Sequence, residues 1–469
     1  MRFKVFNRKT HSAQNSIAPS CVVIFRSQPP TKEQFAYLSP KQTEDLTDEF
    51  DVAVDPQDIK WVHPDEATTN DEIWTALMWG NSRDKAFLKR LKTYRTISDP
   101  GTEIRIESRE GIIVGDRKKS QPKLLDRLIL KTKDFPTDSL IYLNTEALTT
   151  NGEVHTHSKD STNFDAFSCP QLIIKQSWRK PTSRFQARLL PDTCREGILC
   201  SQSYLTVHVP PMQRGFIEAA CLSYNSALAV YFLLLTSGRF ASYRPEPLVE
   251  ELKRVPIPEP RPKLLHGLER PEDIDLRTCE AFGFKNAEWV LVDDLFRITL
   301  PDFKGDKNSP GRKRTRRTAG VTEEPELRHY CEYFIRVLKA GFGQDKSITA
   351  TIFQETNNNR LPYRLVAFEL NGQSKEQVSV EPLGSLALLA ELNRLNRIWL
   401  RSRTIAGGSI YYQRVARIYD HRGKTPTIFL LKPDAYRHWT RSMGLYDADE
   451  VAADFLRWQV HMDEAAKPE

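Results

Sequence analysis

The feature that most restricts the fold is an unbroken apolar run near the middle of the chain, from Ala227 to Leu235. Its nine residues are too few to cross a bilayer, which takes about 20 apolar residues, and polar residues precede the run. No membrane partner is therefore expected. The pattern predicts a long buried helix over about 215–236, ended by a glycine cap at Gly238.

A helix of this kind needs a substantial core around it, and the rest of the chain can supply one. The chain has 469 residues, of which 39% are hydrophobic and 28% are charged. This length predicts two or three domains, and the composition excludes a disordered protein. The net charge of +7 is compatible with a polyanionic partner.

Two segments with few apolar residues divide the chain. Val255 to Pro262 contains four prolines, and residues 303–324 carry seven basic side chains. We interpret the second segment as a flexible basic loop, either a solvated linker or a tether for phosphates. The predicted divisions are 1–45 (a segment with one strand that needs a sheet from elsewhere), 46–104 (helical connector), 105–262 (mixed α/β domain), 263–324 (linker with the basic loop) and 325–469 (C-terminal lobe).

Periodicity predicts an α+β fold, with a mixed α/β domain over 105–262 followed by a separate α/β C-terminal lobe. Helical spacing is expected at residues 72–94, with a possible break at Gly80-Asn81, and again at 330–338, 383–400 and 447–458. Short strand patterns occur at 20–26, 111–115, 139–143, 171–175, 197–200, 363–370, 410–419 and 427–432.

The cysteines and the N-terminus favour a cytoplasmic location. The seven cysteines are odd in number and form no Cys-x-x-Cys pair, which argues against a structural zinc site. Several lie in apolar runs, where a reduced cysteine behaves as a small hydrophobic residue. The first residues contain no apolar core of signal-peptide length.

The most informative window is Gln171 to Arg188, which holds five basic residues and no acidic one. Its basic side chains are interleaved with two aromatic ones. Basic residues neutralise phosphates, arginine also reads guanine edges, and aromatic rings stack on bases. The alternative interpretation is a strand followed by an exposed charged loop. The candidate DNA-binding residues here are Lys175, Trp178, Arg179, Lys180, Arg184 and Arg188.

Two further basic groups lie in the same region of the chain. The first follows the strand pattern at 111–115 and contains Lys118 and Lys119. The second lies beyond the long helix and contains Arg239, Tyr243 and Arg244. Three separate basic groups favour DNA binding over a merely solvated surface.

Catalytic patterns are absent or incomplete in the sequence. No glycine-rich turn follows a strand, and no Asn/Asp-Pro-Pro-Tyr/Phe tetrapeptide occurs; the nearest strings are at Pro29-Pro30 and Pro210-Pro211. His155-x-His157 could bind a metal, but no third ligand stands at a convincing spacing. We predict no catalytic residue, no metal site and no cofactor bound by this chain.

Residues 19–40 and 105–258 resemble a known family, the TaqI-like and type IIG N6-adenine DNA methyltransferases. PSCVVIFRSQPP is similar to the last strand of their catalytic domain. GIIVGDRKK, FSCPQLIIKQSWRK, RFQARLL and SYNSALAVYFLLLTSGRFASYRPEPLVEELKRVPIP are similar to the specificity domain that follows it. The most specific part runs from Asn225-Ser226 through the apolar helix to Val255-Pro256-Ile257-Pro258.

The resemblance implies a target-recognition region of a restriction-modification or phage-defence system that grips double-stranded DNA. The loops around Lys118, Lys175 to Arg184 and Arg239 to Arg244 would then face DNA. S-adenosylmethionine and methyl transfer are expected on a catalytic subunit or domain encoded upstream. The strand at Cys21 to Phe25 would complete that partner's sheet, so we expect this chain to be the downstream part of a larger enzyme.

Three alternatives to this interpretation remain open. The chain could be a truncated methyltransferase remnant. It could be a non-catalytic interaction subunit of a defence complex, in which DNA contact is incidental. It could also be a cryptic enzyme such as a nuclease, although the carboxylate constellation of a nuclease is missing.

Overall fold

The structure is a computed structural model, and it confirms the α+β class with several small sheets. It describes residues 4–7, 12–15, 33–39, 54–113, 118–132, 135, 139–146, 148–152, 155–179, 181–242, 246–306, 308–315, 324–343, 347–355, 363–372, 376–383, 387, 390–395, 415–420 and 425–465. The chain divides into two compact units. The first unit comprises Met1–Thr31 and Asp65–Val292, and the second comprises Lys32–Pro64 and Asp293–Glu469.

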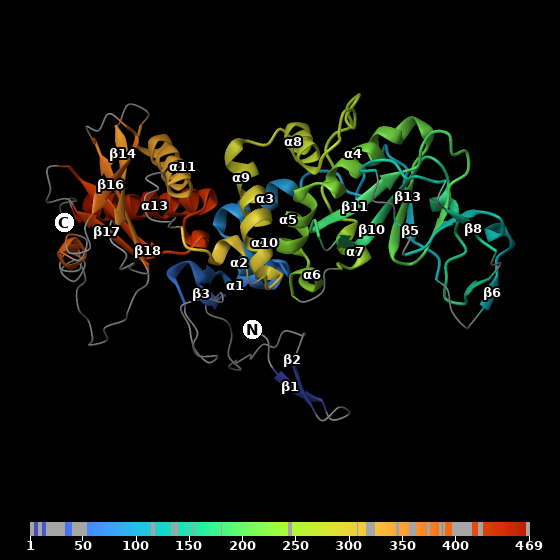
Figure 1. Ribbon diagram of the computed structural model, residues 1–469, viewed down its shortest axis with the longest axis horizontal. Coiled ribbons are helices and arrows are strands. Elements are labelled where there is room, and N and C mark those ends of the chain that lie inside the picture. The colour runs from blue at the N-terminus through green and yellow to red at the C-terminus, as the bar shows by residue number, and fades with distance from the viewer. Residues whose placement is uncertain are drawn as a thin grey trace. The chain divides into compact units, whose positions relative to one another are not determined.

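The first unit is built on a four-stranded antiparallel sheet in the order β11-β10-β13-β5 (Figure 1). Smaller sheets are β1-β2, β12-β7-β8 and β6-β9. The strands are β1 Lys4–Asn7, β2 Ser12–Asn15, β5 Glu107–Glu110, β6 Lys118–Ser120, β7 Leu128–Leu130, β8 Thr149–Thr150, β9 His155–His157, β10 Gln171–Arg179, β11 Arg184–Leu189, β12 Leu199–Cys200 and β13 Tyr204–His208. The predicted strand at 171–175 is thus confirmed as part of β10.

Helices α4 and α5 pack on this sheet, and they correct the prediction of one continuous helix over 215–236. The chain breaks at Ser226, and the segments Pro211–Asn225 and Ala227–Thr236 are bent by 74°. The side chain of Asn225 donates to the carbonyl of Ala187 at 2.8 Å and accepts from its N–H at 3.1 Å, so it continues the hydrogen bonding of edge strand β11. These contacts hold Asn225 at the sheet while the chain turns.

Every residue of α5 is buried, as the apolar run predicts. In the described part of the chain no single helix is long and apolar enough to span a membrane; only the bent pair reaches that length together. The helices of the first unit are α1 Pro64–Thr69, α2 Ile73–Trp79, α3 Ser82–Leu91, α4 Arg214–Asn225, α5 Ala227–Thr236, α6 Gly238–Ser242, α7 Val249–Leu252, α8 Pro271–Phe282 and α9 Asn286–Asp294.

The predicted break at Gly80-Asn81 is confirmed, and its cause is a capping box. The side chain of Asn81 accepts hydrogen bonds from the backbone of Arg83 at 2.9 Å and Asp84 at 3.3 Å. The Asp84 carboxylate in turn accepts the N–H of Asn81 at 2.8 Å. Reciprocal bonds of this kind satisfy the free N–H groups that start α3.

Residues 263–302 differ from the predicted linker, because they form α8, α9 and a helical continuation through Phe303. Pro271 begins α8 at a position where the missing N–H costs nothing, and Gly283 ends it with φ of 62°. Charged residues recur along α8, so the apolar spacing of a helix is weak in its sequence. The predicted basic loop is described only in part, and Lys307, Arg316 and Arg317 lie outside the described residues.

The second unit has a five-stranded sheet in the order β16-β14-β15-β18-β17, and α11 and α13 pack on it. A separate two-stranded sheet pairs β3 with β4. The elements are β3 Phe35–Leu38, β4 Ile59–Val62, α10 Leu300–Phe303, α11 Pro325–Phe342, β14 Ile348–Glu355, β15 Tyr363–Leu370, β16 Val378–Leu383, β17 Ala416–Asp420, β18 Thr427–Pro433 and α13 Arg441–Ala465. The predicted strand at 363–370 and the predicted helix at 330–338 are confirmed.

A buried polar cluster lies inside the core of the second unit. The Lys432 ammonium contacts the Asp447 carboxylate and lies 3.3 Å from the Tyr330 hydroxyl, which itself donates to Asp447 at 2.6 Å. Burial lowers the pKa of Lys432. The cluster joins β18, α11 and α13, so it stabilises the unit only while all of its members are present.

Candidate nucleic-acid interface

The β10–β11 hairpin carries most of the predicted DNA-binding residues, and its strand register separates their roles. Leu172 lies opposite Leu189, and Ile174 lies opposite Ala187, so these apolar residues share one face of the sheet. Because side chains alternate along a strand, Lys175 projects from the opposite face. A register shift between Lys175 and Arg179 marks an irregularity in β10 towards the hairpin end.

Lys175 lies on an aromatic support. Its ammonium nitrogen is 5.8 Å from the centroid of the Phe135 ring. Phe135 in turn stacks on Tyr204, with ring centroids 5.6 Å apart and planes 21° apart. The Tyr204 hydroxyl donates to the carbonyl of Lys131 at 3.2 Å, which fixes the ring. A cation near the face of such a ring gains some electrostatic stabilisation, but the ring does not cancel its charge.

Lys175 and Arg179 carry charges that the described part of the fold does not neutralise. Burial lowers the pKa of Lys175, and the nearby Arg179 guanidinium lowers it further. Neither residue forms an ion pair with any acidic side chain that the structure describes. The two half-buried positive charges repel each other, and an anion that bound between them would stabilise both.

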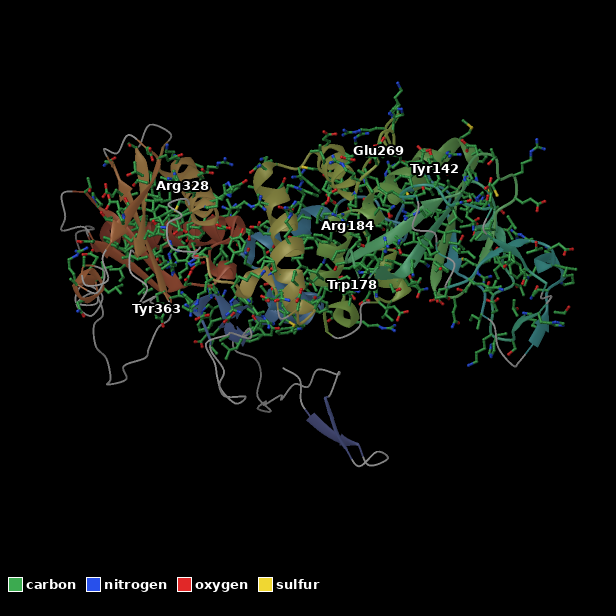
Figure 2. The ribbon with its side chains drawn as sticks, in the orientation of Figure 1. Tyr142, Trp178, Arg184, Glu269, Arg328 and Tyr363 are labelled. Carbon is green, nitrogen blue, oxygen red and sulfur yellow. The ribbon has the colours of Figure 1, made fainter. Side chains whose placement is uncertain are left out.

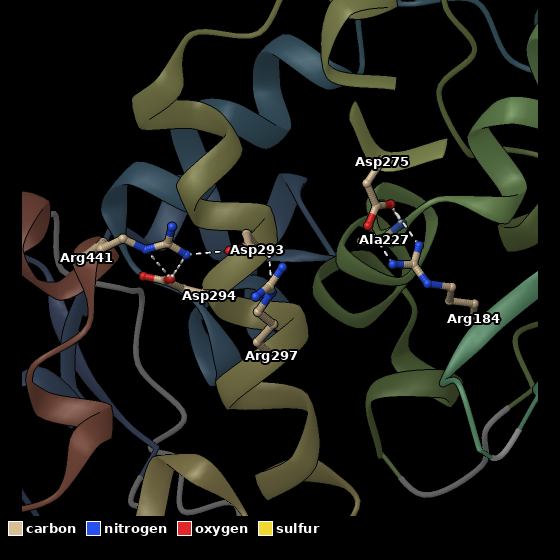
Figure 3. Close-up of polar contacts among 7 residues, drawn as sticks. All are labelled: Arg184, Ala227, Asp275, Asp293, Asp294, Arg297 and Arg441. Atoms are coloured by element: carbon tan, nitrogen blue, oxygen red, sulfur yellow. Dashed lines mark hydrogen bonds and ion pairs between the residues drawn. The ribbon is translucent and has the colours of Figure 1, made fainter. Parts of the chain in front are cut away.

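Arg184 was predicted to contact DNA, but its guanidinium is used within the fold. It lies opposite Arg179 in the hairpin and donates two bonds to the carboxylate of Asp275, at 2.8 Å and 2.5 Å (Figure 3). The same carboxylate accepts the backbone N–H of Ala227 at 2.8 Å. Asp275 therefore ties β11 and the start of α5 to α8, which places α8 in the first unit.

Trp178 and Arg188 are buried rather than presented at the surface. Trp178, which Figure 2 labels, is 7% exposed. Its ring packs edge-on against the Phe240 ring, with centroids 4.9 Å apart. Arg188 is 2% exposed and donates to the Asn225 side chain at 3.1 Å. Their side chains support the hairpin, and we exclude them from the proposed contact surface.

The third predicted group is largely outside the described residues. Tyr243 and Arg244 are not described, and neither is Lys180 of the hairpin. Arg239 is described and forms an ion pair with Glu246 at 3.5 Å. DNA contact by these residues stays a prediction.

Lys118 and Lys119 lie in the two-stranded β6–β9 ribbon. The backbone register sets Lys118 opposite His157 and Ser120 opposite His155, so Ser120, His155 and His157 share one face of the ribbon. Lys119 lies on the other face, opposite the buried Thr156. No group of three metal-binding side chains occurs among the described residues.

A hollow of about 340 Å³ lies beside the sheet in the first unit. Arg127, Cys194 and Gly197 line it. The Arg127 guanidinium donates to the carbonyls of Phe167 and Gly197, each at 2.6 Å. Burial lowers the pKa of Arg127. These carbonyl bonds hold the walls of the hollow together.

Comparison with known proteins assigns neither a family nor a function to the chain. No protein-family model matches the chain, and no curated protein matches it. The geometry of the first unit therefore has to carry the functional argument.

Proposed function

We propose that the first unit binds double-stranded DNA as the sequence-recognising portion of an adenine-N6 methyltransferase or restriction-modification system, with S-adenosylmethionine and catalysis on a separate part. The observation that carries the proposal is the pair of half-buried cations Lys175 and Arg179, which no described carboxylate neutralises. The missing Asn/Asp-Pro-Pro-Tyr/Phe tetrapeptide supports the non-catalytic assignment.

Charge and burial together support a phosphate at this position. A cation taken partly out of water loses hydration energy and needs an anion to recover it. Phosphate oxygens supply that charge, and they account for a large share of the contacts in protein–DNA complexes. The nearby Phe135 support restricts the Lys175 side chain, so less freedom is lost when a phosphate binds.

The test is the salt dependence of binding to a duplex, measured by fluorescence anisotropy for wild type, Lys175→Ala and Arg179→Ala. Each phosphate contact contributes roughly −0.9 to the slope of log K against log salt. Each substitution should therefore flatten the slope by about 0.9. It should also weaken binding roughly eightfold near 0.1 M salt through counterion release alone.

The matched control is Lys285→Ala, which removes the same charge from an exposed position between α8 and α9. It should leave the slope unchanged. Equal slopes for wild type, Lys175→Ala and Arg179→Ala would refute the proposed contacts. Absence of DNA binding by the wild type at low salt, alone and with the upstream gene product, would refute the proposed function.

A second candidate function, a non-catalytic interaction subunit, is favoured by the β3–β4 sheet of the second unit. Strand register places Ala36 and Leu38 on the same face as Ile59 and Trp61. Leu38 is 54% exposed and Trp61 is 65% exposed. Exposed apolar surface of this kind marks contact sites. Under this function, Trp61→Ser would abolish capture of the upstream catalytic subunit in nuclease-treated extract and leave DNA binding unchanged.

A further inference from the structure

Two segments of the first unit lie side by side at the wall of the hollow. The Gln171 side chain donates to the carbonyl of Ile198 at 2.9 Å and accepts from its N–H at 2.8 Å. Arg127 bridges the carbonyls of Phe167 and Gly197. Four hydrogen bonds that involve two side chains therefore fix the chain around 167–171 against Gly197 and Ile198.

Gly197 allows this close approach. A Cβ atom added there would lie 1.8 Å from the carbonyl oxygen of Phe167 and 2.9 Å from the Cα of Ser168. The position can hold only a residue without a side chain unless the backbone shifts. The backbone of Gly197 thus contacts Phe167 and Ser168. Phe167 and Ser168 directly precede Cys169, and Gly197 lies three residues after Cys194.

The two segments bring Cys169 and Cys194 together. Both thiols pack against the same apolar cluster beneath the sheet, and each one shifts the pKa of the other. The Cys194 thiol donates to the carbonyl of Glu196 at 2.9 Å. Each thiol is half-buried and free. Burial, together with a smaller contribution from the Cys194 thiol, raises the pKa of Cys169 to about 11.

We infer that Cys169 and Cys194 form a dithiol site that small-molecule disulfides, such as oxidised glutathione, convert into an intrachain disulfide. The Cys194 thiolate attacks one sulfur of the disulfide and releases one glutathione thiolate. Cys169 then loses its proton, attacks the Cys194 sulfur and releases the second glutathione. Both thiol protons end on the two glutathione molecules, so two cysteines are oxidised and one disulfide is reduced.

The other described thiols offer no comparable pair. Cys200, Cys221 and Cys331 are fully buried, and burial raises the pKa of each. Cys279 is half-buried, as Cys169 and Cys194 are, but its nearest described acceptor is the carbonyl of Phe284 at 3.9 Å. Cys279 is therefore the matched control thiol. The inference does not depend on DNA binding.

The test uses the full-length protein incubated with oxidised glutathione at mildly alkaline pH, then blocked with a maleimide and analysed by intact mass and peptide mapping. The wild type should lose two maleimide-reactive thiols, gain no glutathione mass and yield a peptide pair cross-linked through Cys169 and Cys194. Cys279→Ser should give the same cross-link. Cys169→Ser should instead retain glutathione on Cys194, and dithiothreitol should reverse both products.

Two results would overturn the inference. In the first, the wild type keeps a stable glutathione adduct on Cys169 or Cys194, as the Cys169→Ser variant does under the same conditions. In the second, the two thiols of the wild type stay fully maleimide-reactive throughout. Neither the variants nor the reagent changes Lys175 or Arg179, so either result would contradict the dithiol site without contradicting the proposed DNA binding.

Discussion

Replacing Asp275 by alanine tests the structural role that the fold assigns to Arg184. The Asp275 carboxylate accepts two bonds from Arg184, at 2.8 Å and 2.5 Å, and one from the backbone N–H of Ala227 at 2.8 Å. The side chains of Arg184 and Asp275 are only 11% and 18% exposed. The substitution therefore leaves a mostly buried guanidinium without its counterion and the first N–H of α5 without an acceptor.

The expected cost follows from this burial. Removing one partner of a buried ion pair destabilises a protein by about 3–5 kcal/mol. Some exposure of both side chains lets water replace part of the interaction, so we expect a loss near the lower end, about 3 kcal/mol. Asp275→Asn keeps an oxygen for Ala227 and should cost about half as much, because the backbone bond survives.

Chemical denaturation followed by circular dichroism measures the loss, and hydrogen exchange of the peptide spanning 225–236 localises it. Arg184→Met combined with Asp275→Leu should recover most of the stability, since neither charge is then left buried alone. The reasoning is refuted if Asp275→Ala costs less than about 0.5 kcal/mol, the size of an ordinary surface substitution. Unchanged exchange in α5 would refute the capping role of Asp275.

Three further outcomes are expected. Asp447→Ala should lower the free energy of unfolding by about 3–5 kcal/mol, because it leaves the buried Lys432 ammonium without its counterion. Adding Lys432→Met to the same chain should restore much of that stability. A loss under about 1 kcal/mol for Asp447→Ala would contradict this. Burial raises the pKa of Cys221 to about 12, so at pH 8 only about one thiol in ten thousand is ionised, and iodoacetamide should label Cys221 far more slowly in native than in denatured protein; equal labelling rates would contradict it. Gly197→Ala should cost about 2 kcal/mol or more because its Cβ meets the Phe167 carbonyl, and an unchanged denaturation midpoint would contradict that packing.

Helices, strands and turns can be predicted where neighbouring residues in the sequence determine them. The strand at 363–370 and the helix within 325–342 follow from period-2 and period-3.6 spacing, and the break at Gly80-Asn81 follows from turn and capping residues. The bend at Ser226 follows the polar pair Asn225-Ser226, but such a pair also fits a continuous helix, so the pair alone does not predict a bend. The bend depends on bonds between Asn225 and Ala187, 38 residues away in the chain.

The candidate site could be predicted only in part for the same reason. A cluster of basic residues is visible in the sequence, but their counterions are not. Asp275 lies 91 residues from Arg184, and nothing in the sequence links them. Phe135 and Tyr204, which support Lys175, come from separate segments that only the folded sheet brings together.

The most direct test of sequence-specific DNA recognition is selection from a random duplex library with the wild-type protein, followed by sequencing of the bound fraction. The account predicts enrichment of one motif that contains an adenine, bound roughly a thousandfold or more tightly than random duplex. The Lys175→Ala/Arg179→Ala protein should lose affinity for every sequence and retain the folded state. A wild type that binds DNA and enriches no motif, with or without its catalytic partner, would contradict the account.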